Sequence, residues 1–210
     1  MDRIVQPSVE SYMHMLLPQR DQVLTEIETL ASNHGIPIVG PAVGRFLFLL
    51  ARLVAAKHVF EMGSAVGYST IWLARAVGKN GTVYFTDTGE ENARQARTYF
   101  NKARVSKQVK LLIGDAVQLI DTVKGNFDLI FIDLDKKQYP EAFAKAYPRL
   151  RHGGLLVTDN VLLLGLVAES NIEDTTIESV REFNRLLYSK DDLFTTILPI
   201  RDGVSVSLRL

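Results

Sequence analysis

Short apolar runs alternate with segments of helical periodicity along most of the chain. The apolar runs predict strands near 58–62, 82–86, 109–113, 127–132, 154–158, 194–199 and 204–209. The helical periodicity predicts helices between them, at about 68–77, 90–103, 116–122, 139–150 and 175–188. This alternation is typical of an α/β fold in which a mostly parallel sheet carries helices on both faces.

The two ends of the chain depart from this alternation. The segment from Leu198 to Gly203 is too short for a crossover helix, so the last two strands are predicted to form an antiparallel hairpin. Two helices precede the sheet, over 20–33 and over 41–56. With 210 residues and no linker or repeat, the chain is predicted to form one domain, in which residues 57–210 build a seven-stranded core.

Composition narrows the class of protein. Acidic and basic residues number 24 each, which argues against electrostatic binding of nucleic acid or anionic lipid over a broad surface. The chain has no cysteine, so disulfides, thiolate metal ligands and a cysteine nucleophile are excluded. The N-terminal residues lack an apolar signal core, and the longest near-apolar run, 46–56, is broken by Arg52. We therefore expect a soluble, cytoplasmic protein that binds no membrane.

The most informative segment is 58–76, HVFEMGSAVGYSTIWLARA, in which a buried strand turns at glycines into an amphipathic helix. Gly63 and Gly67 let the backbone approach a ligand, and the helix directs unpaired N–H groups at the turn. A dinucleotide fold requires glycine where Ala65 stands, so pyrophosphate is disfavoured. A buried Glu61 carboxylate favours a cationic or N–H-rich ligand, because burial without a partner is costly.

Polar side chains follow each of the first five predicted strands, at the edge where ligands of such sheets bind. They are Glu61, Asp87, Asp115, Asp133 with Asp135 and Lys136, and Asp159 with Asn160. Asp87 is placed to accept hydrogen bonds from a ribose diol, although Asp87 or Thr88 equally suits the N-cap of the next helix. Asp115 suits an adenine edge or a helix cap. Tyr68 suits core packing or contact with a ligand in the turn.

Asp133, Asp159 and Asn160 offer three oxygen ligands from neighbouring strand ends, the ligand type that Mg²⁺ or Ca²⁺ takes. Beside a divalent ion an ammonium group is disfavoured, so Lys136 is a candidate general base. Taken alone, the DN pair is equally a turn, and the DLDKK segment is equally a solvated loop. Together they predict a metal site with an adjacent base.

Five segments in combination resemble one family: VFEMGSAVGYST, TDTGEENA, GDA, FIDLDKKQY and TDNVL. The family is the cation-dependent, S-adenosylmethionine-using O-methyltransferases, which include the catechol and caffeoyl-CoA enzymes. The resemblance extends from about Tyr12 to Leu208. It implies a Rossmann-like class I methyltransferase fold in a homodimer, with residues 1–56 contributing to the acceptor site or the dimer contact.

The resemblance also implies the roles of particular residues. Metal ligands fall on Asp133, Asp159 and Asn160, and Lys136 matches the base, so that Asp133 and Lys136 lie at the catalytic centre. Cofactor contacts fall on Val39, Glu61, Gly63, Ser64, Ser69, Asp87, Ala116 and Asp135. The implied reaction transfers methyl from S-adenosylmethionine, with Mg²⁺, Ca²⁺ or Mn²⁺ bound, to a hydroxyl of a small catechol-like or hydroxycinnamoyl-like acceptor.

Two segments depart from the family pattern, and three other functions compete. Thr88-Gly89-Glu90 replaces valine-aspartate-proline, and the apolar segment 161–170 suggests a hydrophobic acceptor or a dimer contact. One alternative is methylation of hydroxyuridine in tRNA, which needs a basic face. The candidates for it are Arg20, Arg45, Arg149, Arg151, Lys136 and Lys137. A nicotinamide-dependent dehydrogenase is opposed by Ala65, and a non-catalytic binding protein is opposed by the retained base and ligands.

Overall fold

The computed structural model describes residues 4–210 of the chain. Its helices are α1 (Pro7–Met15), α2 (Gln22–His34), α3 (Gly40–Leu53), α4 (Tyr68–Val77), α5 (Glu90–Lys102), α6 (Ala116–Thr122), α7 (Tyr139–Ala146) and α8 (Thr175–Tyr188). Its strands are β1 (His58–Met62), β2 (Thr82–Asp87), β3 (Val109–Ile113), β4 (Phe127–Ile132), β5 (Leu150–Thr158), β6 (Leu193–Leu198) and β7 (Val204–Arg209). Short 3₁₀ turns are η1 (Ser106–Gln108), η2 (Lys136–Gln138), η3 (Tyr147–Arg149) and η4 (Leu163–Ala168).

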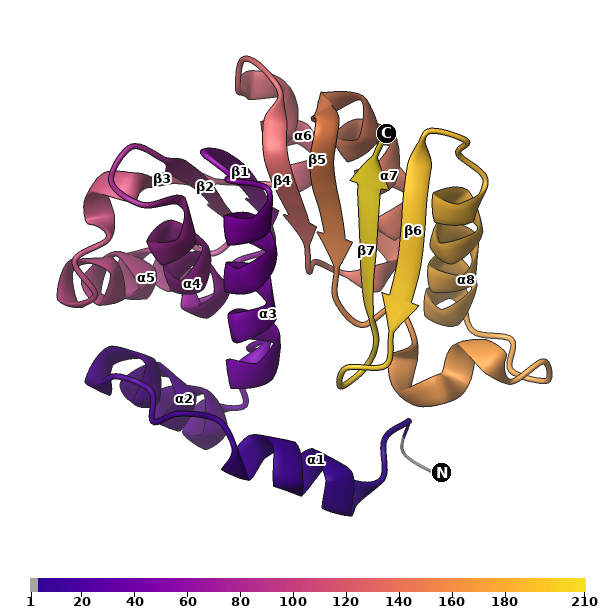
Figure 1. Ribbon diagram of the computed structural model, residues 1–210, viewed down its shortest axis with the longest axis horizontal. Coiled ribbons are helices and arrows are strands. Elements are labelled where there is room, and N and C mark those ends of the chain that lie inside the picture. The colour runs from indigo at the N-terminus through magenta and orange to yellow at the C-terminus, as the bar shows by residue number, and fades with distance from the viewer. Residues whose placement is uncertain (1–3) are drawn as a thin grey trace.

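The seven strands form one mixed sheet in the order β3-β2-β1-β4-β5-β7-β6. Strands β1 to β5 pair in parallel, whereas β7 is antiparallel to both β5 and β6. The predicted α/β fold and terminal hairpin are confirmed. Because β7 reverses direction, β6 runs with the parallel strands, and the turn after β6 lies at the same edge as their carboxyl ends (Figure 1).

Helices cover both faces of the sheet, as the alternating pattern predicted. Helices α2 to α5 pack on one face around a cluster that includes Leu47, Phe85 and Phe131. Helices α6 to α8 pack on the other face around Phe60, Phe183 and their neighbours. Burial on both faces explains why the central strands are almost continuously apolar. Within residues 4–210, no helix is both long and apolar enough to cross a bilayer.

Some element boundaries differ from the predictions. The helix predicted over 139–150 ends at Ala146, and Pro148 lies in the η3 turn that leads directly into β5. Strand β5 therefore begins at Leu150 instead of 154, with an irregular register opposite Phe127 and Leu129. Helix α3 ends at Leu53, before the left-handed Ala55. Helix α1 and turn η4 were not predicted, and α1 has no buried residue that a core pattern would reveal.

Candidate functional site

A cavity of about 780 Å³ opens at the carboxyl ends of the parallel strands. Every predicted site residue except Glu61 lines it. These residues are Val39, Gly63, Ser64, Tyr68, Ser69, Asp87, Asp115, Ala116, Asp133, Asp135, Lys136, Asp159 and Asn160. The parallel sheet thus brings residues that are far apart in sequence to one edge, as its topology requires.

The glycine turn after β1 shapes one wall of the cavity. Gly63 has φ +87°, and a Cβ there would lie 2.3 Å from the backbone carbonyl oxygen of Asp133. Gly67 has φ +85° and caps α4 in the left-handed conformation, with Phe100 packed against it. The two glycines therefore permit close contact of the turn with the end of β4 and with α5.

The Glu61 carboxylate lies beneath this turn and is fully buried. Its Oε2 accepts hydrogen bonds from the hydroxyls of Ser64, at 2.8 Å, and Thr70. Its Oε1 has no partner among the described residues. Burial raises the pKa of Glu61 to about 7, while hydroxyls of Ser69, Thr70 and Ser64 oppose the rise. The sequence reasoning missed these hydroxyl partners, which belong to the same segment as the turn.

Asp87 and Asp115 each hold a local turn while lining the cavity. Asp87 accepts hydrogen bonds from the backbone amides of Ala65, at 3.0 Å, and Gly89, at 2.8 Å. The N-cap of α5 is Gly89, so the alternative that Asp87 or Thr88 is the cap is wrong. Asp115 is the N-cap of α6 and accepts from the amide of Val117 at 2.9 Å.

Tyr68 connects the cavity wall to α2. Its hydroxyl donates to Oε1 of Glu28 at 2.6 Å, and Arg20 binds the same carboxylate through Nη2 at 2.8 Å. Burial, followed by the neighbouring Glu28 carboxylate, raises the pKa of Tyr68 far above its usual value. The tyrosine therefore remains a neutral donor, and its hydroxyl is committed to Glu28.

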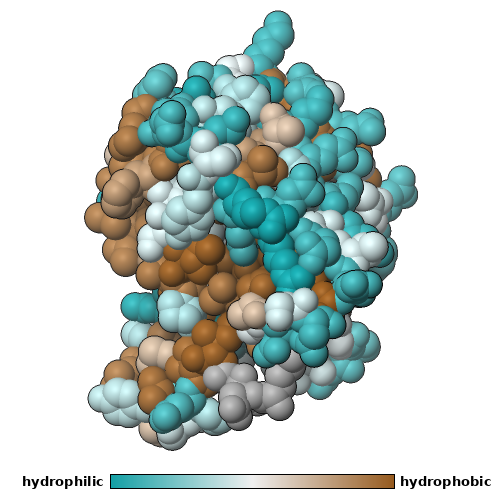
Figure 2. Space-filling model, turned by 90° about the vertical axis from the view of Figure 1, so that its right-hand side faces the viewer, coloured by the Kyte–Doolittle hydropathy of each residue, from teal (hydrophilic) through white to brown (hydrophobic). Residues whose placement is uncertain are grey.

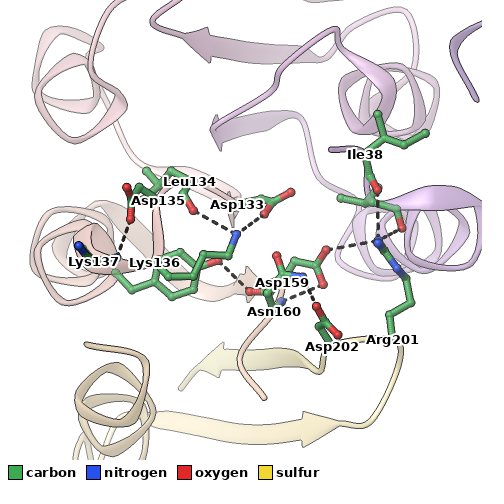
Figure 3. A network of polar contacts seen from close by, with 12 residues as sticks. Ile38, Asp133, Leu134, Asp135, Lys136, Lys137, Asp159, Asn160, Arg201 and Asp202 are labelled. Carbon is green, nitrogen blue, oxygen red and sulfur yellow. Dashed lines mark hydrogen bonds and ion pairs between the residues drawn. The ribbon is translucent and has the colours of Figure 1, made fainter. Parts of the chain in front are cut away.

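The opposite wall is an edge of charged groups at the ends of β4 and β5 (Figure 3). Lys136 Nζ lies 3.1 Å from Oδ1 of Asp133 and donates at 3.1 Å to the carbonyl oxygen of Leu134. The buried Tyr139 donates to the carbonyl oxygen of Asp159 at 2.8 Å. These contacts fix the loop after β4 against the end of β5, and so fix the separation between Lys136 and Asp159.

Asp159 is the most deeply buried carboxylate of this edge, with a relative exposure of 1%. Burial and then the negative charge of Asp133 raise the pKa of Asp159, while Arg201 and Lys136 oppose the rise. The guanidinium of Arg201 lies 3.8 Å from Oδ2 of Asp159. Asn160 adopts φ +57° and donates from Nδ2 to Asp202 at 3.4 Å. Figure 3 shows Lys136 and Arg201 on opposite sides of Asp159.

The donor set at this edge fits a hard divalent cation. It consists of two carboxylates, Asp133 and Asp159, and the Asn160 amide, all lining one cavity. The repulsion that raises the pKa of Asp159 is one that a bound cation relieves. Residues 4–210 contain no cluster of three or more His, Cys, Asp or Glu side chains placed to hold a metal, so such a site relies on the amide as its third ligand.

Several cavity residues were missed by the sequence reasoning. They are the segment from Gly35 to Ile38, Gln138 and Arg201. A usable signal was present for Arg201, because an antiparallel last strand places the end of β6 at the same edge as the other strand ends. Residues 161–170 do not line the cavity; instead Leu162, Leu163 and Val167 pack against the cluster around α7 and α8.

The cations considered for RNA binding do not gather on one face. Arg149 and Arg151 lie at the amino end of β5, whereas Lys136 follows the carboxyl end of β4, at the opposite edge of the sheet. Arg151 pairs with Asp128, and Arg20 with Glu28. Arg149 and Arg151 therefore lie away from the cavity, and the charges of Arg20 and Arg151 are balanced by carboxylates.

Comparison with known proteins gives one consistent result. A family model described as O-methyltransferase matches residues 11–210. A catechol O-methyltransferase of Niastella koreensis is 36% identical, with 96% of each chain covered. The O-methyltransferase TomG of Streptomyces achromogenes, solved in complex with SAM, is 30% identical with a TM-score of 0.88 and 96% of each chain covered. An O-methyltransferase of Bacillus cereus, solved in complex with SAH, is 30% identical with a TM-score of 0.88 and 97% of each chain covered.

Proposed function

The chain belongs to the O-methyltransferase family, and from this premise we propose that it transfers a methyl group from S-adenosylmethionine to a hydroxyl of a small aromatic acceptor with vicinal hydroxyls, aided by a divalent cation. The observation that carries the proposal is a single cavity with a glycine turn on one wall and an edge of oxygen ligands with a lysine on the other. A methyl donor on the first wall and an acceptor on the second wall are then neighbours.

The wall made by the glycine turn is the proposed binding site of the methyl donor. Gly63 and Gly67 leave room for a nucleoside near the backbone, and Asp87 lines the cavity where a ribose diol would lie. Asp115 and Ala116 are placed for the adenine, and Val39, Tyr68, Ser69 and Asp135 for the methionine portion. Glu61 and Ser64 support the turn from below, through the hydrogen bond between them. The solved relatives in complex with SAM and SAH support this assignment.

The charged edge is the proposed binding site of the methyl acceptor. Asp133, Asp159 and Asn160 would hold the divalent cation, Mg²⁺ by preference, with Ca²⁺ or Mn²⁺ as alternatives. When bound, such a cation lowers the pKa of a coordinated hydroxyl and orients it. Lys136 is the proposed acceptor of the hydroxyl proton, at Nζ. The acceptor oxygen forms a bond to the methyl carbon as the bond from that carbon to sulfur breaks, leaving neutral S-adenosylhomocysteine.

The apolar part of the cavity favours an aromatic acceptor. Ile36, Pro37, Ile38 and Leu134 line it beside the charged edge. A planar ring with two adjacent hydroxyls would rest on these side chains and direct its oxygens at the edge. The catechol O-methyltransferase of Niastella koreensis supports this choice over a nucleic acid acceptor, as does the position of Arg149 and Arg151 at the opposite edge of the sheet from the cavity.

The test is an acceptor screen with labelled S-adenosylmethionine and Mg²⁺ that includes catechols, caffeoyl thioesters, flavonoids and hydroxyuridine-bearing tRNA. We expect methylated catechols, with activity lost in a chelator and restored by added Mg²⁺. Lys136→Ala is expected to lower turnover by about 10²–10⁴-fold. The matched control is Lys137→Ala, which removes an exposed neighbouring lysine that does not line the cavity. Full activity in a chelator contradicts the cation dependence, and exclusive methylation of tRNA contradicts the acceptor class.

We also propose that the chain forms a homodimer through its N-terminal helices. Helix α1 has no buried residue, and Figure 2 shows apolar surface at the upper left of the molecule and also on its lower part, where α1 lies. Exposed apolar side chains there and on α3 include Val9, Tyr12, Met13, Met15, Leu49 and Leu53. Light scattering is expected to give twice the 23.5 kDa mass of one chain. Leu53→Glu is expected to halve that mass, whereas Tyr188→Glu on α8 leaves it unchanged.

A further inference from the structure

Arg201 joins three parts of the chain that are distant in sequence. It lies in the turn between β6 and β7, and its Nη1 donates to the carbonyl oxygens of Ile38, at 3.3 Å, and Val39. The same nitrogen lies 3.8 Å from Oδ2 of Asp159. Arg201 therefore connects the wall formed by residues 35–39 to the charged edge, and Figure 3 shows its guanidinium between them.

The turn that carries Arg201 is held in place independently of its side chain. Its neighbour Gly203 packs so closely that a Cβ there would lie 2.4 Å from Leu162. The carbonyl oxygens of Asp202 and Gly203 accept hydrogen bonds from the amides of Leu162, at 2.8 Å, and Val161, at 3.0 Å. Arg201 itself adopts φ +51°, a conformation that costs a non-glycine residue free energy. The turn thus directs the guanidinium at residues 38 and 39.

The segment that Arg201 contacts packs against the core through Ile36, Ile38 and the buried Val39, but it makes few other hydrogen bonds. Residues 36–39 form no helix or strand, and the first of them is held by the hydrogen bond from the Ile36 amide to Ala31 at 3.1 Å. The amide of Val39 donates no hydrogen bond to any other residue in the range 4–210. Arg201 thus donates to the carbonyl oxygen of Val39, and the amide of Val39 remains available to a ligand.

We propose that Arg201 is a positioning residue that couples the two halves of the cavity: it orients the backbone of Ile38 and Val39 for the methyl donor, and its charge competes with a divalent cation for Asp159. This inference rests on the proposed function. A lysine at this position keeps a charged donor but lacks the rigid, planar guanidinium to which Nη1 belongs, so it replaces arginine only in part.

The test compares wild type with Arg201→Ala, Arg201→Lys and Arg201→Gly. The glycine variant adopts the left-handed turn without strain, so it removes the side chain while preserving the turn. Arg97→Ala is the matched control, because Arg97 is exposed on α5 and does not line the cavity. Calorimetry measures the affinity for S-adenosylhomocysteine and, separately, for Mn²⁺ alone. Hydrogen exchange measures protection of the amides of residues 35–40, and thermal melts confirm folding.

We expect the alanine and glycine variants to bind S-adenosylhomocysteine at least tenfold more weakly and Mn²⁺ at least threefold more tightly, with faster exchange at residues 35–40. The lysine variant is expected to be intermediate, and Arg97→Ala unchanged. If wild type does not bind S-adenosylhomocysteine, the proposed function itself fails. If wild type binds it and the alanine variant binds equally well, or if exchange at residues 35–40 is unchanged, the positioning role is overturned. Unchanged Mn²⁺ affinity overturns the competition for Asp159.

Discussion

The two walls of the cavity are built in different ways. The wall around Glu61 comes from one continuous segment, 61–70, and its groups are held by burial, glycine conformations and short hydrogen bonds from hydroxyls. The wall around Asp159 is assembled from the ends of β4 and β5 and the turn after β6, and charges hold it together. The first wall depends on close packing and the second on charge balance, so substitutions at the two walls should fail in different ways.

The largest expected effect is at the charged wall. Asp159→Asn removes one of two carboxylates proposed to hold the cation, so turnover should fall by about 10²–10⁴-fold. The affinity for S-adenosylhomocysteine should remain within threefold, because the glycine turn is untouched. Steady-state kinetics and calorimetry measure the two quantities, with exposed Asp191→Asn as the control. A matching loss of donor affinity would show that the two walls are not separable.

A large effect of another kind is expected at the packed wall. Gly63→Ala forces a Cβ into the Asp133 carbonyl at a left-handed φ, so it should destabilise the protein by about 2–4 kcal/mol. The melting temperature should fall by about 5–15 °C, together with donor affinity. Gly125→Ala is the control, since Gly125 also has positive φ, at +85°, but no heavy atom within 4 Å of its Cβ position. Equal losses in both variants would assign the effect to backbone conformation alone.

A smaller effect, which depends on pH, is expected on the melting temperature when Glu61 is replaced by glutamine. Burial raises the pKa of Glu61 to about 7 from 4.5, so the folded state holds a proton that the unfolded state releases, and stability is lost as pH rises through this interval. Glu61→Gln removes this loss, so its melting temperature should exceed that of wild type by about 3–8 °C at pH 8. The difference should shrink towards pH 5. Thermal melts across this range measure it, and a difference independent of pH would contradict the shift.

The smallest effect is expected at Tyr68. Tyr68→Phe removes the hydrogen bond to Glu28, which Arg20 still binds, so unfolding should cost about 1 kcal/mol less free energy. Donor affinity should change less than threefold, because the hydroxyl is committed to Glu28 and the ring remains. Urea denaturation measures the stability, with the exposed Tyr188→Phe as the control. A large loss of affinity for the methyl donor would show that the Tyr68 hydroxyl itself contacts that donor.

The contrast between the packed wall and the charged wall also explains which features of the site could be predicted from the sequence. The strands, the hairpin and the strand-end acids follow from periodicity and from the rule that parallel strands end at one edge. The packed wall is readable because its glycines and Glu61 are contiguous. Arg201 and Ile38 are in contact although they are 163 positions apart in the sequence, and no local pattern signals such a contact. Helix α1 was missed for another reason, since a helix without a buried face leaves no core periodicity.

The position of β7 has a consequence for how the molecule is made. During synthesis β7 emerges after β6, yet in the sheet it lies between β5 and β6. Until it inserts, β5 exposes an unpaired backbone edge and β6 has no neighbour, a state open to wrong pairing with other chains. Since Arg201 is placed by the turn into β7, the nascent chain cannot complete its cavity until that insertion occurs.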